Sequence, residues 1–305
     1  MSEQIIYNNV DISGSVETEE AVHDMYAGCE QADTLTLTFE DEGADWDAWG
    51  AVPGDTVVYK NGGTSTGTMY VHSVYPENGF FTVRAASIPQ NAKLCHTKSW
   101  ESVHLLQVGS EVAGRFGFSF RIEGMENFYY DYIAQENEPD IAFLNRIAKL
   151  EGGILIVYNN EVILYGEAAL EKRETDLEVT TGDGTFSGCD RSGDIFGKAK
   201  LSAGSCYGVF TADPSNSRTL DIKGRATSDA EAKRWARGLL RQANKNGRTC
   251  RLQKDIMREF SAGITVDLDN QAAPKWSGKM FLYHVRHEYK KERTTLFMRP
   301  PLEGY

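Results

Sequence analysis

The sequence contains no long apolar run, and this absence argues against a membrane-spanning helix. No stretch of the 305 residues approaches the roughly 18 consecutive apolar residues that such a helix needs. The first residues, Met1 to Gln4, show neither the basic region nor the apolar core of a secretion signal. We therefore expect no membrane insertion. We expect the protein to stay in the cytoplasm when it is made, or to leave by a route that needs no signal.

Cysteine is scarce and odd in number, which argues against a disulfide framework. No two cysteines are close in the sequence, so we expect reduced thiols that are mostly buried. A chain of this length is long enough for two or three domains, whose cores need no covalent support. The five cysteines are Cys29, Cys95, Cys189, Cys206 and Cys250.

Basic residues are nearly missing from the first third of the chain. Residues 1–110 carry 4 basic and 16 acidic side chains, whereas residues 220–305 carry 18 basic and 10 acidic ones. These two segments could carry solvated faces whose charges differ by chance, or surfaces that meet in an assembly. The total net charge of −12 argues against specific nucleic-acid binding.

The first hundred residues show the pattern of β-strands. Residues 34–39 alternate strictly, which places Leu35, Leu37 and Phe39 on one face. Asn61-Gly62-Gly63 is typical of a hairpin turn. Strands that recur every 10–15 residues with turns between them favour a small sandwich or barrel.

The middle of the chain predicts a helix followed by a hairpin. Pro139 suits the first turn of a helix over residues 139–151, which Gly152-Gly153 ends. Residues 154–158 and 162–165, joined by Asn159-Asn160, form a hairpin candidate. The apolar face of the helix consists of Ile141, Leu144, Ile147 and Ala148.

The last third predicts further strands and one long helix over residues 229–246. Ser228 is expected to cap this helix, and Glu231 to complete a capping box. The predicted fold class is α+β and mostly β, with two tube-like β-barrel domains flanking a small α+β domain. The predicted domains are residues 1–105, 106–170 and 171–305, and the long helix falls in the last of them.

No group of residues forms a recognisable catalytic, metal or cofactor site. His284 and His287 are three apart in a strand, which places them on opposite faces and makes a shared metal unfavourable. Cys206 lies in a Gly-x-Cys-x-Gly sequence, but no helical pattern follows it as a nucleophile elbow requires. Glycine- and aspartate-rich turns at residues 182–184 and 190–194 lack the calcium-loop pattern.

Two charged features leave alternatives open. Glu136 and Asp140 could be a carboxylate pair for glycan cleavage, but exposed acidic residues beside a helix start are the commoner case. The basic residues from Lys233 to Lys245 could touch nucleic acid, although a solvated face or a face docked on an acidic neighbour is favoured. We expect neither a cofactor nor a metal.

The segment from Tyr132 to Gly153 resembles a signature of the phage late control protein D family, the hubs of contractile-tail baseplates. The family signature begins with Gln, a polar pair and Asp. It continues with Phe-Leu-x-Arg-(Leu/Ile)-Ala and ends with Glu-x-Gly. The hub portion of type VI secretion spike proteins is similar, and residues 32–55 and 278–296 resemble the flanking parts. Pro139 replaces the usual Ser or Thr. The matching positions are Asp140, Phe143, Leu144, Arg146, Ala148 and Gly152.

This resemblance implies a structural protein rather than an enzyme. Members form homotrimers whose two barrels per subunit reconcile a sixfold tail tube with a threefold spike. The implied partners are the tail tube protein, a separate spike protein and other baseplate or tape-measure proteins. Incorporation in a phage, bacteriocin or injection-system particle after synthesis in the bacterial cytoplasm is expected. A tail-associated peptidoglycan-cleaving enzyme and a tail tube or tube-initiator protein remain alternatives.

Overall fold

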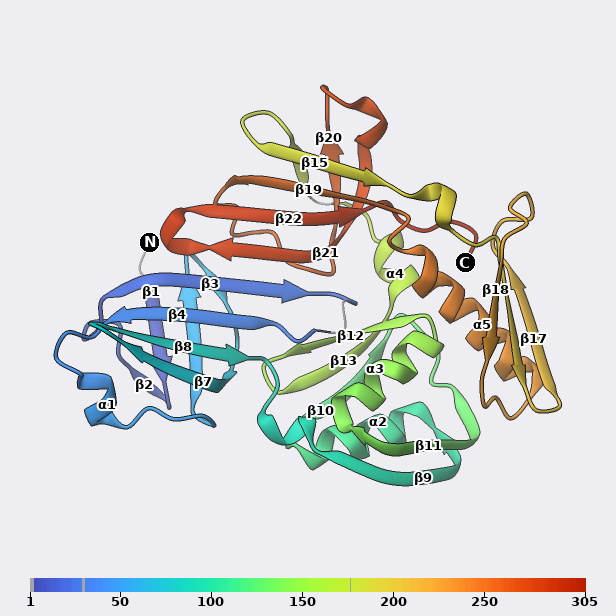
Figure 1. Ribbon diagram of the computed structural model, residues 1–305, viewed down its shortest axis with the longest axis horizontal. Coiled ribbons are helices and arrows are strands. Elements are labelled where there is room, and N and C mark those ends of the chain that lie inside the picture. Colours follow the sequence, from blue (N-terminus) through green and yellow to red (C-terminus); the bar gives the residue numbers. More distant parts are fainter. Residues whose placement is uncertain (1–2, 29–30, 176) are drawn as a thin grey trace.

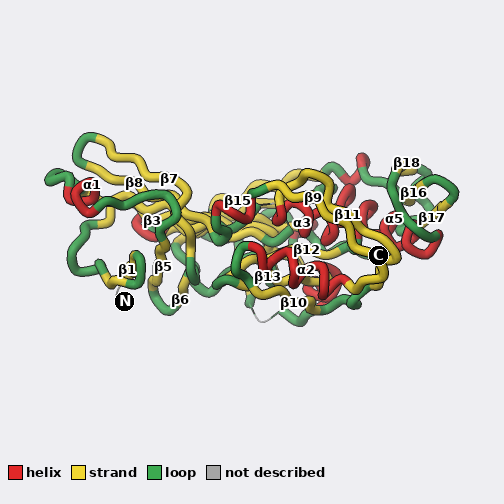
Figure 2. The backbone as a smooth tube through the Cα atoms, turned by 90° about the horizontal axis from the view of Figure 1, so that it is seen from below, coloured by secondary structure: helices red, strands yellow, loops and turns green. Residues whose placement is uncertain are grey.

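The computed structural model describes residues 3–28, 31–175 and 177–305, so Cys29 lies outside the described residues. Figure 1 shows the first β-rich unit at the left, a second β-rich unit above it, a mixed module at lower right, and a small sheet with a long helix at the right-hand end. Seen from below, the molecule is elongated and flat (Figure 2). In the described part of the chain, no helix is long and apolar enough to cross a membrane.

The first β unit contains the strands expected from the alternating pattern. Leu35, Leu37 and Phe39 are each at most 1% exposed and lie on the inner face of β4, as predicted. The short helix α1 (Asp45–Trp49) brings Trp46 into this core, where its ring stacks 4.5 Å from Phe39 and 5.1 Å from Phe81. The strands are β1 (Glu3–Tyr7), β2 (Val10–Asp11), β3 (Thr18–Tyr26), β4 (Thr34–Glu40), β5 (Thr56–Asn61), β6 (Thr64–Ser65), β7 (Met69–Glu77) and β8 (Phe80–Ala86).

The second β unit comes from the last third of the chain and has its own apolar core. Leu252, Val266, Leu282 and Leu296 are at most 1% exposed there. The short 3-10 helices η2 (Ser192–Asp194), η3 (Pro274–Trp276) and η4 (Tyr289–Lys291) lie at turns of this region. The strands are β14 (Glu178–Thr180), β15 (Thr185–Asp190), β19 (Arg248–Asp255), β20 (Thr265–Asp269), β21 (Gly278–Glu288) and β22 (Arg293–Arg299).

The two β units are joined by a ladder between β3 and β21, which the sequence did not indicate. This antiparallel pairing places both units in one 14-stranded sheet, with the order β15-β19-β22-β21-β3-β4-β8-β7-β5-β1-β2 along its main path. Asp24 on β3 accepts from His284 on β21 at 2.8 Å. The His284 ring stacks between Tyr26 and Phe297, with centroid distances of 4.4 and 4.2 Å.

His23 and His287 face each other within this ladder and are both buried. His287 bonds to Thr294 through Nδ1 and to the Phe260 carbonyl through Nε2, so it lies on the side opposite His284, as predicted. Burial lowers the pKa of His23 to about 3, and burial also lowers the pKa of His287. Both rings are therefore neutral in the folded protein at ordinary pH.

The middle module consists of a two-stranded ribbon, a three-stranded sheet and three helices. Helix α3 (Asp140–Leu150) matches the predicted helix, and its Leu144 and Ile147 are buried as expected. The sheet order is β10-β13-β12, and the ribbon pairs β11 with β9. The other elements are η1 (Gln90–Lys93), β9 (Cys95–His104), α2 (Leu105–Arg115), β10 (Ser119–Glu123), β11 (Tyr129–Pro139), β12 (Gly153–Tyr158), β13 (Glu161–Gly166) and α4 (Glu167–Lys172).

Helix α2 has no counterpart among the sequence-based expectations. Its apolar positions Leu105, Val108 and Val112 recur at helical spacing, but Gly109 and a second glycine weaken that pattern. Gly109 is required by packing, because a Cβ there would lie 2.2 Å from the Phe120 ring.

The long helix α5 (Asp229–Asn244) lies on a separate sheet of β16 (Lys198–Ala203), β17 (Cys206–Thr211) and β18 (Thr219–Lys223). Ser228 caps it as predicted, since its Oγ accepts from the Glu231 N–H at 3.2 Å. The prediction of a capping box was wrong, because the Glu231 carboxylate accepts from the Thr227 N–H at 2.6 Å instead of from the Ser228 N–H. Glu231 thus binds the residue before the cap.

The cores group these elements differently from the predicted ranges. Strand β9, within the range 1–105, pairs with β11 of the middle module. Helix α5, within the range 171–305, shares one buried apolar cluster with α2 and α3. Gly238 permits that contact, because a Cβ there would lie 2.2 Å from the Leu150 carbonyl. The three-domain division itself stays a prediction.

Replacing Leu144 by Ala tests the assigned face of α3. The side chain is 2% exposed, so its truncation should lower the free energy of unfolding by about 2–5 kcal/mol. Leu94→Ala is the matched control, because Leu94 is 58% exposed and should cost less than about 0.5 kcal/mol. Chemical denaturation measures both, and equal effects would contradict the assignment.

The histidines at the β3–β21 ladder predict a loss of stability in acid. Because their folded pKa values lie below about 6.5, the unfolded chain binds protons first as the pH falls. The contribution of each histidine to the free energy of unfolding should therefore fall below about pH 6.5, by up to about 1.4 kcal/mol per pH unit.

Comparing the native chain with His23→Leu isolates this contribution. The variant should show a flatter pH dependence between about pH 6 and 4, measured by denaturant unfolding at each pH. Asp33, whose pKa burial raises to about 7, acts in the opposite direction but is common to both proteins. His104→Asn is the control, since His104 is exposed. An unchanged slope in His23→Leu would contradict the prediction.

Candidate functional site

The six residues of the family-like segment fall into three structural roles around α3. Phe143, Leu144 and Ala148 are buried in the apolar core of the middle module. Gly152 follows the helix with φ of 70°, a left-handed conformation that favours glycine. The remaining two residues, Asp140 and Arg146, take part in polar contacts. The functional importance of these positions stays a prediction.

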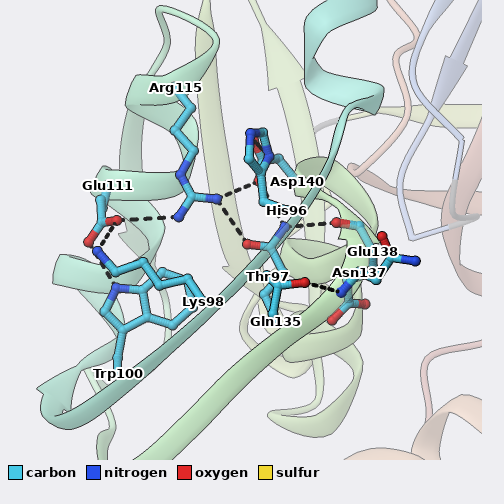
Figure 3. A network of polar contacts seen from close by, with 10 residues as sticks. All are labelled: His96, Thr97, Lys98, Trp100, Glu111, Arg115, Gln135, Asn137, Glu138 and Asp140. Carbon is cyan, nitrogen blue, oxygen red and sulfur yellow. Dashed lines mark hydrogen bonds and ion pairs between the residues drawn. The ribbon is translucent and has the colours of Figure 1, made fainter.

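Asp140 is the centre of a buried polar network (Figure 3). Its side chain is fully buried, and Oδ1 accepts from Arg115 Nη1 at 2.9 Å and from Gln135 Nε2 at 2.8 Å. Oδ2 lies 3.1 Å from His96 Nδ1. Gln135 also accepts from Arg115 at 3.0 Å and donates to the Glu138 carbonyl at 2.9 Å. The network therefore connects α2, the β9–β11 ribbon and the first turn of α3.

Glu111 extends the same network along α2. It accepts from Lys98 Nζ at 2.6 Å, from Trp100 Nε1 at 2.8 Å and from Arg115 Nη2 at 3.3 Å. Burial alone would raise the pKa of Glu111, but these hydrogen bonds outweigh it and hold the pKa below its usual range. Glu111 is thus an anion matched by cations, and Asp140 lies against the Arg115 guanidinium, an arrangement suited to fixing geometry.

Arg146 holds the far end of the ribbon against α3. Its guanidinium pairs with the Glu138 carboxylate, and Nη2 donates to the Ala134 carbonyl at 2.7 Å. The guanidinium also lies over the Phe143 ring, 5.2 Å from its centroid. This residue therefore joins β11 to α3 on the outer side of the helix.

A second buried carboxylate, Glu151, connects the end of α3 to α5. It accepts from Tyr130 Oη at 2.8 Å, from Arg234 Nε at 2.6 Å and from Trp235 Nε1 at 2.8 Å. Burial would lower the pKa of Arg234, but the hydrogen bond and charge of Glu151 raise it above its usual value. The Arg234 guanidinium also lies 4.4 Å from the centre of the Phe128 ring.

A third cluster joins α4, α5 and β22 through four buried charged residues. Glu167 accepts from Arg241 Nε and from Arg299 Nη2, both at 2.8 Å. Glu171 pairs with Arg299 Nη1 at 2.6 Å and with Arg241 Nη2. Burial opposes ionisation of Glu167, but Arg299, Lys245 and Arg241 together lower its pKa. This cluster ties the second β unit to the middle module.

The structure separates the two carboxylates that were considered for glycan cleavage. Glu136 is exposed and pairs with Arg225. Asp140 is buried in its network, so the expectation that it is exposed was wrong. Its partner Arg115 lies 25 residues earlier in the chain, on a helix that was not predicted. Glu136 and Asp140 therefore have different cationic partners and different surroundings.

The other sequence candidates lie in ordinary structural positions. Cys206 begins strand β17 directly after a hairpin turn, which does not fit a nucleophile elbow. Residues 182–184 turn between β14 and β15. Lys233 and Arg237 are exposed, whereas Arg241 of the expected basic face is buried in an ion-pair cluster.

One group of acidic residues in the described chain brings three possible ligand atoms together. Oxygens of Glu17, Glu19 and Glu40 lie within 4.8 Å of one another, and all three residues are exposed. The charge of Glu17 is the main cause that raises the pKa of Glu40. Exposed acidic groups of this kind are common without an ion, so we assign no metal to them.

Replacing Asp140 by Asn tests whether the buried network stabilises the fold. The substitution removes the charge that compensates Arg115 and should cost about 3 kcal/mol of unfolding free energy. Glu136→Gln is the matched control, because its ion pair is exposed and should contribute no more than about 1 kcal/mol. Similar denaturation midpoints for both variants would contradict a stabilising role for Asp140.

Comparison with known proteins finds similarity in three dimensions only. No protein-family model and no curated protein sequence matches the chain. A 43 kDa tail protein of prophage MuSo2 from Shewanella oneidensis is 14% identical, with 98% of this chain and 99% of that chain covered and a TM-score of 0.75. A tail protein from Neisseria meningitidis MC58 is 11% identical, with 98% and 96% covered and a TM-score of 0.76.

A further match is a type VI secretion system component of E. coli, described as structurally similar to the bacteriophage T4 tail proteins gp27 and gp5. It is 11% identical and has a TM-score of 0.62, with 95% of this chain and 76% of that chain covered. The alignments with the two tail proteins extend over nearly the full length of both chains. The chain therefore has the fold of these phage tail proteins, which a type VI secretion component shares.

Proposed function

We propose that the chain is a structural hub subunit in the baseplate of a contractile phage tail or tail-like particle. The observation that carries this proposal is the match over 98% of the chain to two tail proteins, which leaves no large part of the fold unaccounted for. The polar clusters around α3 and α5 support the proposal, because their charged groups pair with one another and hold secondary-structure elements together.

The proposed assembly is a homotrimer that joins a sixfold tail tube to a threefold spike. Two β units in each chain, linked by β3 and β21, would present six similar units around a ring of three copies. The acidic first third and the basic last third would give neighbouring copies complementary surfaces. Tail tube, spike and tape-measure proteins are the proposed partners.

Particle reconstruction tests the hub directly. We expect three copies of the chain at the junction between tube and spike. Six copies along the tube would indicate a tail tube or tube-initiator protein instead, and absence from the particle would overturn the proposal. Native mass spectrometry of the purified chain with and without its spike measures the stoichiometry, and raising the salt concentration should slow assembly.

We further propose that the chain does not itself cleave peptidoglycan. The proposal is supported by Asp140, which is buried against Arg115 and Gln135, and by Glu136, which pairs with Arg225. A zymogram with purified chain should show no clearing. Clearing that disappears in Glu136→Gln or Asp140→Asn, with the fold retained, would establish the enzymatic alternative.

A further inference from the structure

A groove of about 380 Å³ lies between the β9–β11 ribbon and the β16–β18 sheet. Figures 1 and 2 both place these two sheets with α5 at the end of the molecule opposite the first β unit. One wall is formed by β11 residues from Tyr132 to Glu138, and the other by Ile222 and Lys223 at the end of β18 and by the two residues after it, Gly224 and Arg225. The volume is within the usual range of ligand pockets.

Each wall of the groove includes part of a strand at the edge of a sheet. In the described part of the chain, β11 pairs only with β9 and β18 pairs only with β16. In Figure 1, β9 lies on the side of β11 away from β18. An edge strand leaves alternate N–H and C=O groups without ladder partners. On β11 the Ala134 carbonyl already accepts from Arg146, and the groups that remain free can pair with an added strand.

The floor of the groove is apolar. Trp235 and Leu239 of α5 line it together with Leu150 of α3 and Leu201 of β16. Side chains of an extended peptide point alternately to its two sides. A strand lying in this groove would therefore place every second side chain on the floor, which favours apolar residues at those positions.

The basic residues at the rim of the groove differ in whether they have an ion-pair partner. Arg146 pairs with Glu138, and Arg225 pairs with Glu136. Lys223 is exposed, and the described residues give it no ion-pair partner. The Arg225–Glu136 pair connects the two walls, but both side chains are more than half exposed, so it contributes little to stability. An incoming acidic residue would therefore meet an available cation at Lys223.

We propose that this groove binds an extended segment of a partner protein by strand addition between β11 and β18. The segment carries apolar side chains at alternate positions, which contact Trp235 and Leu239, and an acidic side chain that pairs with Lys223. The proposal goes beyond the hub assignment and does not rest on it, since the groove is complete within one chain.

Selection from a random peptide library on the full chain tests the proposal. We expect enriched peptides with apolar residues at every second position and an acidic residue at one end. Their affinity, measured by fluorescence anisotropy, should fall at least about tenfold when alternate backbone amides are N-methylated, because methylation removes the donors that strand pairing needs. No enrichment, or affinity insensitive to N-methylation, would overturn strand addition.

Substitutions locate the binding site. Lys223→Glu and Leu239→Glu should each weaken binding at least about tenfold. Lys233→Glu should leave it unchanged, because Lys233 is exposed on α5 but does not line the groove. Thermal melting confirms that each variant is folded, and Lys223→Glu decides alone if Leu239→Glu is not. Equal binding to Lys223→Glu and the native chain would overturn the proposal.

The same selection also shows whether the groove binds a partner protein or a second copy of this chain. A consensus that matches a segment of this chain would replace the partner protein by a second copy and contradict the proposal as stated. A consensus unrelated to this chain supports it. Because the selection uses the isolated chain, its outcome is separate from particle reconstruction: the groove can fail while the hub assignment stands, and the reverse also holds.

Discussion

A buried carboxylate must be compensated by cations or hydrogen-bond donors, and this constraint organises the half of the molecule around α3 and α5. Asp140, Glu151 and Glu167 are all buried, and each accepts a hydrogen bond from at least one element that is distant in sequence. Apolar packing alone would tolerate small shifts of these helices. The directional bonds to Arg115, Arg234 and Arg241 fix their positions.

Each of the three carboxylates connects a different set of secondary-structure elements. Asp140 fixes α3 against the ribbon and α2, whereas Glu151 fixes the other end of α3 against α5. Glu167 fixes α5 and the second β unit against α4. Breaking any one of them leaves a buried charge without its counterpart, which is why such clusters specify geometry even where their net contribution to stability is small.

The sequence predicted what depends on local periodicity and missed what depends on distant partners. Helix α3, helix α5 and strand β4 carry clear apolar faces, and the structure confirms all three. The burial of Asp140 could not be read from its neighbours, because Arg115 approaches it from another helix. Helix α2 was missed since glycines interrupt its pattern, although Gly109 is there to admit Phe120.

The number of basic residues in the last third of the chain did not predict which of them are exposed on α5. The basic residues of the last third suggested a positively charged helix face, yet Arg241 is buried and Arg234 contacts Glu151 and Phe128. Counting charges along the sequence cannot separate side chains that compensate buried anions from those that face solvent. Lys233 and Arg237, which remain exposed, are better candidates for contacts with other molecules.

The ladder between β3 and β21 has a mechanical consequence. It runs antiparallel from Tyr26 opposite His284 to Val22 opposite Glu288, with its hydrogen bonds perpendicular to the strands. A force that pulls the two β units apart along the strand direction loads all of these bonds at once, in shear. A force that peels the strands from one end loads them one after another. The joined sheet therefore resists sliding of the two units along the strands more strongly than peeling of the strands from one end.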